Sequence, residues 1–401
     1  MPYMEKEMRY AISSHHATTF SGTCFTYLML RSGFEKLAGS VTLLRRAEKR
    51  FNDSLLFLAK TALNTKLVGP HLFDAIELHL TDPRMFCNPF EWKISDKMID
   101  LIGEPIASFH AHIERSPLLG RYTFNLSEIS ARVKRAIESQ LEVAYRIMYA
   151  DPNLVVTDNP VLVFHAGIAR DDEDREKALA RSRESIEFIA VTNKRLYEEY
   201  GSDRKIIPTI ENSPNDRLWL CQTIDEWKQE TLGFTDEVKL TLDYGHILTV
   251  DGEWDRLSNE LRDGKMGDDI VNLHLHYSPE VDHTIRHAHA PLSKIPQSKL
   301  QCLRDNLKQI MEHTGVEKQG YVTLEVPSRN LVDYMPWLQH AKRRLSLANR
   351  FLKGTGFFAS GTDQGTMEDQ LASLRIVKEM VEQSMLGTLQ SSPTDFAASE
   401  A

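Results

Sequence analysis

Histidines gather in one short stretch of this chain, DDIVNLHLHYSPEVDHTIRHAHAPLS at residues 268–293, which holds five of the fifteen histidines in the sequence. Imidazole and carboxylate groups are the protein ligands that bind zinc, manganese or iron. A histidine-rich loop can also be merely solvated, so this stretch alone leaves both interpretations open. The remaining ionisable residues of the chain help to decide between them.

Ionisable side chains recur at the ends of short apolar runs along the whole sequence. They are His110, His165, Glu211, Asp243 with the nearby His246, His274 and Glu325, and His287 and His289 follow the seventh run. The carboxyl ends of parallel strands in a barrel meet at one face, where loops build active sites. The pattern therefore predicts a metal site at that face.

The apolar runs predict the strands that would position these residues. They span 8–14, 73–80, 106–112, 161–167, 205–211, 238–246, 270–276 and 320–326, and several are apolar for four or more residues. Such runs are typical of parallel strands buried on both faces. Helical patterns at 126–149, with Asn125 as a candidate cap, 173–200 and 296–315 alternate with them. We expect an α/β protein with a (β/α)₈ barrel fold.

The barrel is expected to occupy residues 1–354, with a helical insertion at about 20–70 and a closing helix at 330–354. Residues 355–401 would form a Gly- and Thr-rich linker, an appended helix at 367–386 and a disordered Ser/Ala-rich tail.

Bulk composition fits a globular protein, with 41% hydrophobic and 26% charged residues. The net charge of −9 gives no support to a surface generally coated with nucleic acid. The four cysteines form no CxxC pair, and the start, MPYMEKEMRY, lacks the apolar core of a signal peptide. We expect a soluble cytoplasmic protein with reduced thiols and no membrane partner.

Four motifs in order, IENSP, LDYGH, NLHLHYS and VTLEVPS, resemble the xylose isomerase-like TIM barrel superfamily. The resemblance covers roughly residues 70–350. It implies that Glu211, Asp243, His274 and Glu325 form a metal set on strands five to eight. It also implies that His246 either binds a second metal or contacts substrate.

Three further motifs are similar to those of endonuclease IV and the ultraviolet-damage endonucleases, the AP endonuclease family 2 group. By this resemblance SFHAH places a ligand at His110, LVFHAG one at His165, and RHAHAPL one at His289. Two residues depart from the motifs. Ala166 stands where a proline is expected, and His287 stands where an aspartate is expected. A neutral ligand in place of an anionic one lowers the negative charge, so the third metal position stays open.

This ligand set predicts a metal-dependent phosphoester hydrolase of the endonuclease IV type that uses metal-activated water. It would bind two or three ions, zinc first and manganese or iron as alternatives. Glu211 and Glu325 would carry the catalytic roles. A phosphate ester, a nucleotide or a nucleic acid would be the substrate.

The alternative is a metal-dependent sugar or sugar-phosphate isomerase or epimerase with one ion. Glu211 and Glu325 would then exchange protons at carbon, which leaves His110, His165 and His289 without a task. An iron-dependent oxidative enzyme and a non-catalytic metal-binding scaffold also remain open. His276 is expected to face away from His274 and to be a satisfied loop histidine, and Glu77 is as easily explained by pairing with a polar group of a neighbouring strand.

Overall fold

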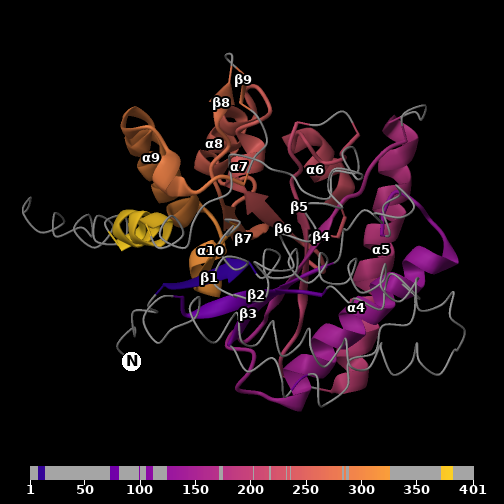
Figure 1. The fold of residues 1–401 in the computed structure, drawn as a ribbon. Coiled ribbons are helices and arrows are strands. Elements are labelled where there is room, and N and C mark those ends of the chain that lie inside the picture. Colours follow the sequence, from indigo (N-terminus) through magenta and orange to yellow (C-terminus); the bar gives the residue numbers. More distant parts are fainter. Residues whose placement is uncertain are drawn as a thin grey trace, which may run out of the picture.

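The computed structural model describes residues 8–13, 73–80, 99, 105–111, 124–170, 175–201, 203–215, 218–231, 233–234, 236–281, 284–285, 289–325 and 372–382. Eight strands form a closed barrel in the order β1-β10-β7-β6-β5-β4-β3-β2 (Figure 1). They are β1 (Arg9–Ser13), β2 (Ala75–His79), β3 (Ile106–His110), β4 (Val161–His165), β5 (Ile207–Glu211), β6 (Lys239–Asp243), β7 (Ile270–Leu275) and β10 (Tyr321–Leu324). All neighbouring strands of the barrel are parallel. The α/β barrel expected from the sequence is therefore confirmed.

The barrel strands are buried on both faces, as their continuous apolar character predicts. Every residue of β3, β7 and β10 is buried. Strand register aligns the polar ends: His165 pairs with Glu211 across β4 and β5, and Asp243 pairs with His274 across β6 and β7. Side chains far apart in the sequence thus reach one height of the barrel.

Helices cover the outside of the barrel. They are α4 (Ala131–Ala150), α5 (Arg175–Tyr200), α6 (Ile224–Thr231), α7 (Tyr244–Ile247), α8 (Glu253–Arg262), α9 (Gln297–His313) and α10 (Val316–Gln319). The two longest, α5 and α4, pack side by side on one flank (Figure 1). None of the helices in the described ranges has the length and apolar character that a membrane crossing requires.

The first turn of α4 corrects one detail of the sequence interpretation. Its cap is Ser130, whose Oγ accepts a hydrogen bond from the Val133 backbone N–H at 3.2 Å. Asn125 lies five residues before this cap. Its side-chain amide instead donates to the Ile168 carbonyl at 3.0 Å, and its Oδ1 accepts from the Ile168 N–H at 2.8 Å. Asn125 therefore ties two loops together.

Short elements of this structure were not predicted. They are the helices α6, α7, α8 and α10, the 3₁₀ turn η3 (Leu292–Lys294) and the hairpin of β8 (Glu280–Val281) and β9 (Thr284–Ile285). A helix at residues 372–382 lies within the predicted 367–386 segment and packs beside α9 (Figure 1). The predicted insertion at 20–70, the closing helix at 330–354, the linker and the tail lie outside the described residues.

Candidate metal centre

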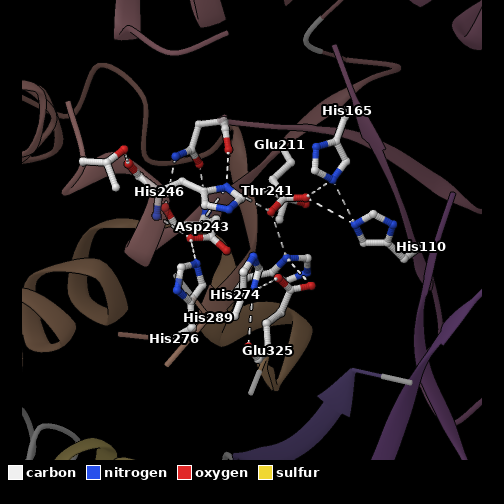
Figure 2. A network of polar contacts seen from close by, with 12 residues as sticks. His110, His165, Glu211, Thr241, Asp243, His246, His274, His276, His289 and Glu325 are labelled. Carbon is white, nitrogen blue, oxygen red and sulfur yellow. Dashed lines mark hydrogen bonds and ion pairs between the residues drawn. The ribbon is translucent and has the colours of Figure 1, made fainter. Parts of the chain in front are cut away.

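The ionisable residues predicted as ligands lie at the carboxyl ends of the barrel strands. His110, His165, Glu211 and Asp243 are the last residues of β3, β4, β5 and β6. His274 is the next-to-last residue of β7, and Glu325 directly follows β10. Figure 2 shows their side chains pointing toward one another. Six strands thus bring these groups to one buried site.

The first cluster, called here the imidazole-pair group, consists of His110, His165 and Glu211. The Nε2 atoms of the two histidines are 3.3 Å apart, and they lie 3.3 and 3.0 Å from Glu211 Oε2. Ligands placed 2.0–2.1 Å from zinc at tetrahedral angles lie about 3.3 Å from one another. The spacing of these three atoms therefore fits one cation.

The second cluster, called here the carboxylate-rich group, consists of Glu211, Asp243, His274 and Glu325. His274 Nδ1 lies 3.2 Å from Glu211 Oε1 and 3.4 Å from Glu325 Oε1. Glu211 thus turns one oxygen toward each cluster. A carboxylate in this position can bridge two cations.

The third cluster, called here the three-histidine group, consists of His246, His276 and His289. His289 also contacts the carboxylate-rich group, because its Nδ1 lies 3.3 Å from Glu325 Oε2. All but one of the predicted ligands are therefore brought together. The exception, His287, lies outside the described residues.

Hydrogen bonds behind the histidines orient the ring nitrogen that faces each cluster. His110 Nδ1 lies 2.7 Å from the Ala111 carbonyl oxygen. Because a carbonyl oxygen only accepts hydrogen bonds, Nδ1 must donate to it, and the other ring nitrogen, Nε2, faces Glu211. His274 Nε2 lies 2.9 Å from Glu77 Oε2, which also accepts a hydrogen bond from Ser108 Oγ at 3.0 Å. Metal-binding histidines commonly donate their second N–H to a carboxylate or carbonyl in this way.

The electrostatics of the carboxylate-rich group favour a positive charge. Burial raises the pKa of Glu325 to about 8, and the charges of Glu211 and Asp243 add to this against the opposing charge of His274. Burial lowers the pKa of His274, but Glu77, Glu325 and Glu211 outweigh burial and hold it well above its usual value. The cluster therefore concentrates buried negative charge.

A buried polar atom that lacks a hydrogen-bond partner would indicate that these residues fit a metal ion. Asp243 is fully buried, and its Oδ2 atom has no hydrogen-bond partner among the described residues. Its Oδ1 atom accepts a hydrogen bond from the His246 backbone N–H at 2.6 Å. A buried carboxylate oxygen without a partner is costly, and a cation would satisfy it. The residues present fit a divalent metal ion.

Three residues of the site were missed or left undecided by the sequence. Glu77 is fully buried behind His274, and its position two residues before the end of β2 was the only signal for it. Asn212 accepts a hydrogen bond from the Asp243 N–H at 2.7 Å and donates to the Asp243 carbonyl at 3.0 Å. His276 was expected to face away from His274, but residues two apart in a strand share a face, and its Nε2 atom lies 2.9 Å from Asp243 Oδ1.

Comparisons with known proteins agree with the barrel. A similar solved structure, a D-tagatose 3-epimerase-like protein, has 16% identity and a TM-score of 0.51, covering 95% of this chain and 100% of that chain. An L-ribulose 3-epimerase has 13% identity and a TM-score of 0.48, covering 86% of this chain and 94% of that chain. Endonuclease IV from Thermus thermophilus has 16% identity and a TM-score of 0.39, covering 69% of this chain and 88% of that chain.

At these identities the structural likenesses concern the fold alone. No curated protein matches the chain. A family model described as the xylose isomerase-like TIM barrel matches residues 71–353. The chain belongs to the xylose isomerase-like TIM barrel family.

Proposed function

We propose that this protein is a metal-dependent phosphoester hydrolase that holds at least two divalent cations at the carboxyl end of the barrel. The observation that carries the proposal is the imidazole-pair group beside the carboxylate-rich group. Glu211 offers Oε2 to His110 and His165 and Oε1 to His274. One cation would need only the carboxylate-rich group, and the imidazole pair then has no task.

The chain's own residues act by fixing positions. The imidazole-pair group would hold one cation, with Ala111 orienting His110, and the carboxylate-rich group would hold the other, with Glu77 orienting His274. When bound, cations so placed lower the pKa of water and stabilise charge on phosphate oxygens. Asp243 and Glu325 complete the anionic side of the site, and the strands keep it rigid. A phosphate ester or nucleotide is the proposed substrate class.

A sugar epimerase or isomerase is the second candidate, because the carboxylate-rich group alone could hold one cation. Its two glutamates, Glu211 and Glu325, would then pass a proton to and from a substrate carbon. The names of the similar solved structures favour this candidate. The imidazole-pair group is the feature that separates the two candidates.

The deciding experiment combines metal content with turnover. Wild-type protein, purified without added metal or chelator, is compared with the double variant His110→Ala/His165→Ala by elemental analysis. Both are assayed on bis(4-nitrophenyl) phosphate and on a panel of ketoses. His313→Ala serves as the control, because His313 is an exposed histidine at the end of α9.

The hydrolase predicts two or more cations in the wild type, one fewer in the double variant, and loss of phosphodiester cleavage. The epimerase predicts one cation in both proteins and ketose turnover that survives the double substitution. A protein that binds no divalent cation would contradict both candidates. Iron as the sole metal, without either activity, would contradict both as well and point to oxidative chemistry.

A further inference from the structure

His165 differs from the neighbouring candidate ligands in how its ring is held. His110 Nδ1 lies 2.7 Å from the Ala111 carbonyl oxygen, and His274 Nε2 lies 2.9 Å from Glu77 Oε2. His165 Nδ1 is buried and has no hydrogen-bond partner among the described residues. Metal-binding histidines almost always donate the N–H that faces away from the metal. The His165 ring must therefore be fixed by other contacts.

The His165 ring nevertheless faces the imidazole-pair group in a ligating orientation. Its Nε2 atom lies 3.0 Å from Glu211 Oε2 and 3.3 Å from His110 Nε2 (Figure 2). A neutral imidazole that offers Nε2 to a cation carries its proton on Nδ1. In His165 that N–H has no acceptor among the described residues, so no hydrogen bond on that side keeps the ring from turning.

Two aromatic rings contact His165, those of His110 and Trp219. The centroids of the Trp219 and His165 rings are 5.4 Å apart, and the ring planes are tilted by 54°. Such separations and tilts are typical of favourable aromatic pairs. His110 is itself a candidate ligand, with its centroid 5.1 Å from that of His165. The half-buried indole of Trp219 is therefore the aromatic neighbour that can support the ring from outside the cluster.

A backbone bridge holds Trp219 beside the segment that directly follows β4. The Ala169 N–H donates to the Leu218 carbonyl at 2.7 Å. The Leu220 N–H donates to the Gly167 carbonyl at 3.0 Å. The loop after β5 is thus tied to the loop after β4 on both sides of Trp219, which fixes the indole relative to the last residue of β4.

The chain turns back toward β5 immediately after this bridge. Cys221 has φ of +59°, an uncommon conformation for a residue other than glycine. Its carbonyl accepts a hydrogen bond from the Ser213 N–H at 2.9 Å, two residues beyond the end of β5. Such a conformation persists only where surrounding contacts hold it. The position of Trp219 is therefore set by the fold of the loop.

We propose that Trp219 is a positioning residue, whose indole holds the His165 ring in the orientation that binds the cation of the imidazole-pair group. The inference rests on the proposed function, because it takes this group as a cation site. Trp219 does by packing what a backbone carbonyl does by hydrogen bonding for His110. It acts on the cation through His165 and is not itself a ligand.

The charges of the two clusters predict which cation depends on Trp219. The imidazole-pair group contains one carboxylate, Glu211, whereas the carboxylate-rich group contains three. Attraction for a dication increases with the negative charge around it. Zinc titration of chelator-treated protein should therefore show a tighter and a weaker step, the weaker belonging to the imidazole pair. His165→Ala identifies that step, because it removes a ligand of this group alone.

The test measures the zinc affinity of each step by competition with a chromophoric chelator, in the full-length wild type, Trp219→Ala and Trp219→Phe. Trp219→Ala should weaken the weaker step by about 10-fold or more, as for other groups that orient a ligand, and leave the tighter step unchanged. Trp219→Phe keeps an aromatic face and should recover most of this affinity. Wild-type affinity in a folded Trp219→Ala, or no recovery in Trp219→Phe, would overturn the proposal.

Two control variants separate packing on His165 from general effects on the loop. Leu220 is fully buried and lies in the same backbone bridge, so Leu220→Ala loosens the loop but keeps the indole. Trp254 is also half-buried but packs against Tyr244, with centroids 5.4 Å apart, so Trp254→Ala removes an indole elsewhere. Both controls should bind zinc as the wild type does, with folding checked by urea denaturation. A loss in Leu220→Ala equal to that in Trp219→Ala would overturn the proposal in favour of loop stability.

His165→Ala separates this inference from the proposed function. If the wild type shows two zinc steps and His165→Ala loses the weaker one, while Trp219→Ala keeps it at full affinity, only the role of Trp219 fails. If the wild type shows a single step that His165→Ala leaves unchanged, the imidazole pair holds no cation, and the proposed function fails together with this inference.

Discussion

Glu77 and His274 form a buried pair across the barrel interior, with 2.9 Å between Glu77 Oε2 and His274 Nε2. The pair fixes which nitrogen of His274 is free to face the carboxylate-rich group. It also places a negative charge behind the ring, which strengthens His274 as a ligand. Glu77 thus acts on the metal centre through another residue.

Glu77→Gln should weaken zinc binding by about 10- to 100-fold, as is usual when such an orienting partner is removed. The amide keeps the shape of the side chain but loses the charge that holds the His274 N–H. Competition with a chromophoric chelator would measure the affinity. Glu142→Gln is the matched control, because Glu142 is exposed on α4. Unchanged zinc affinity in Glu77→Gln would show that His274 is held by its other neighbours.

The loop after β4 directly follows His165, and its shape depends on Gly167. This residue has φ of +109°, where only glycine is unstrained. A Cβ there would lie 2.4 Å from Asn125 Oδ1 and 2.8 Å from the Ser127 backbone nitrogen. The contact would break the hydrogen bonds by which Asn125 joins this loop to the segment before α4.

Gly167→Ala should therefore lower the free energy of unfolding by about 1–3 kcal/mol from backbone strain alone, with the loss of the Asn125 contacts in addition. Gly201→Ala is the control, because Gly201 also has positive φ, +60°, but no atom lies within 4 Å of its Cβ position. Urea denaturation would measure both. If the two variants are equally destabilised, the Asn125 contact contributes nothing.

Helix α6 buries a carboxylate against α5. Glu230 is 1% exposed, and burial raises its pKa to about 8 against the opposing hydrogen bond of Ser182. The ordinary pKa of a glutamate is 4.5. Between about pH 4.5 and pH 8 the Glu230 carboxyl therefore stays protonated in the folded state, whereas it is ionised in the unfolded state. Stability from this group is therefore full below about pH 4.5 and is lost as the pH rises toward 8.

Glu230→Gln should remove this pH dependence. At pH 8 the variant should be more stable to unfolding than wild type by about 2–4 kcal/mol, since one pKa unit corresponds to about 1.4 kcal/mol. At pH 4.5 the two proteins should differ little. Denaturation curves at several pH values test this, with Glu187→Gln, an exposed position on α5, as the control. Parallel pH profiles for wild type and Glu230→Gln would contradict it.

At the scale of the whole molecule, the candidate ligands connect six of the eight barrel strands. A cation that binds only the folded chain stabilises it by mass action, by about 2.7 kcal/mol at a free concentration 100 times the dissociation constant. Zinc should accordingly raise the unfolding temperature of chelator-treated protein, and chelator should lower that of the protein as purified. The Glu211→Gln variant should show a much smaller zinc response, and an equal response would place the zinc elsewhere.

The barrel was predictable because its strands are local patterns. All eight barrel strands lie within the predicted runs, since strands buried on both faces must be continuously apolar. The polar residues at the ends of these runs predicted a site at the carboxyl face of the barrel, and the structure brings His110, His165 and Glu211 together there. The short helices α6 and α7 were not predicted, because four to eight residues give too little periodicity to recognise.

The sequence by itself determined the barrel, the order of its strands and the chemical class of residues at their ends. Only the tertiary structure decided which of these residues share a cluster. His274 meets Glu77 across 197 residues of sequence, a pairing that no local pattern records. His276 enters the three-histidine group because Gly245 leaves room for its ring. The chemical type of each ligand is a property of its own residue and can be read from the sequence. Whether the ligands meet at one point depends on the closure of the barrel and on the register of its strands.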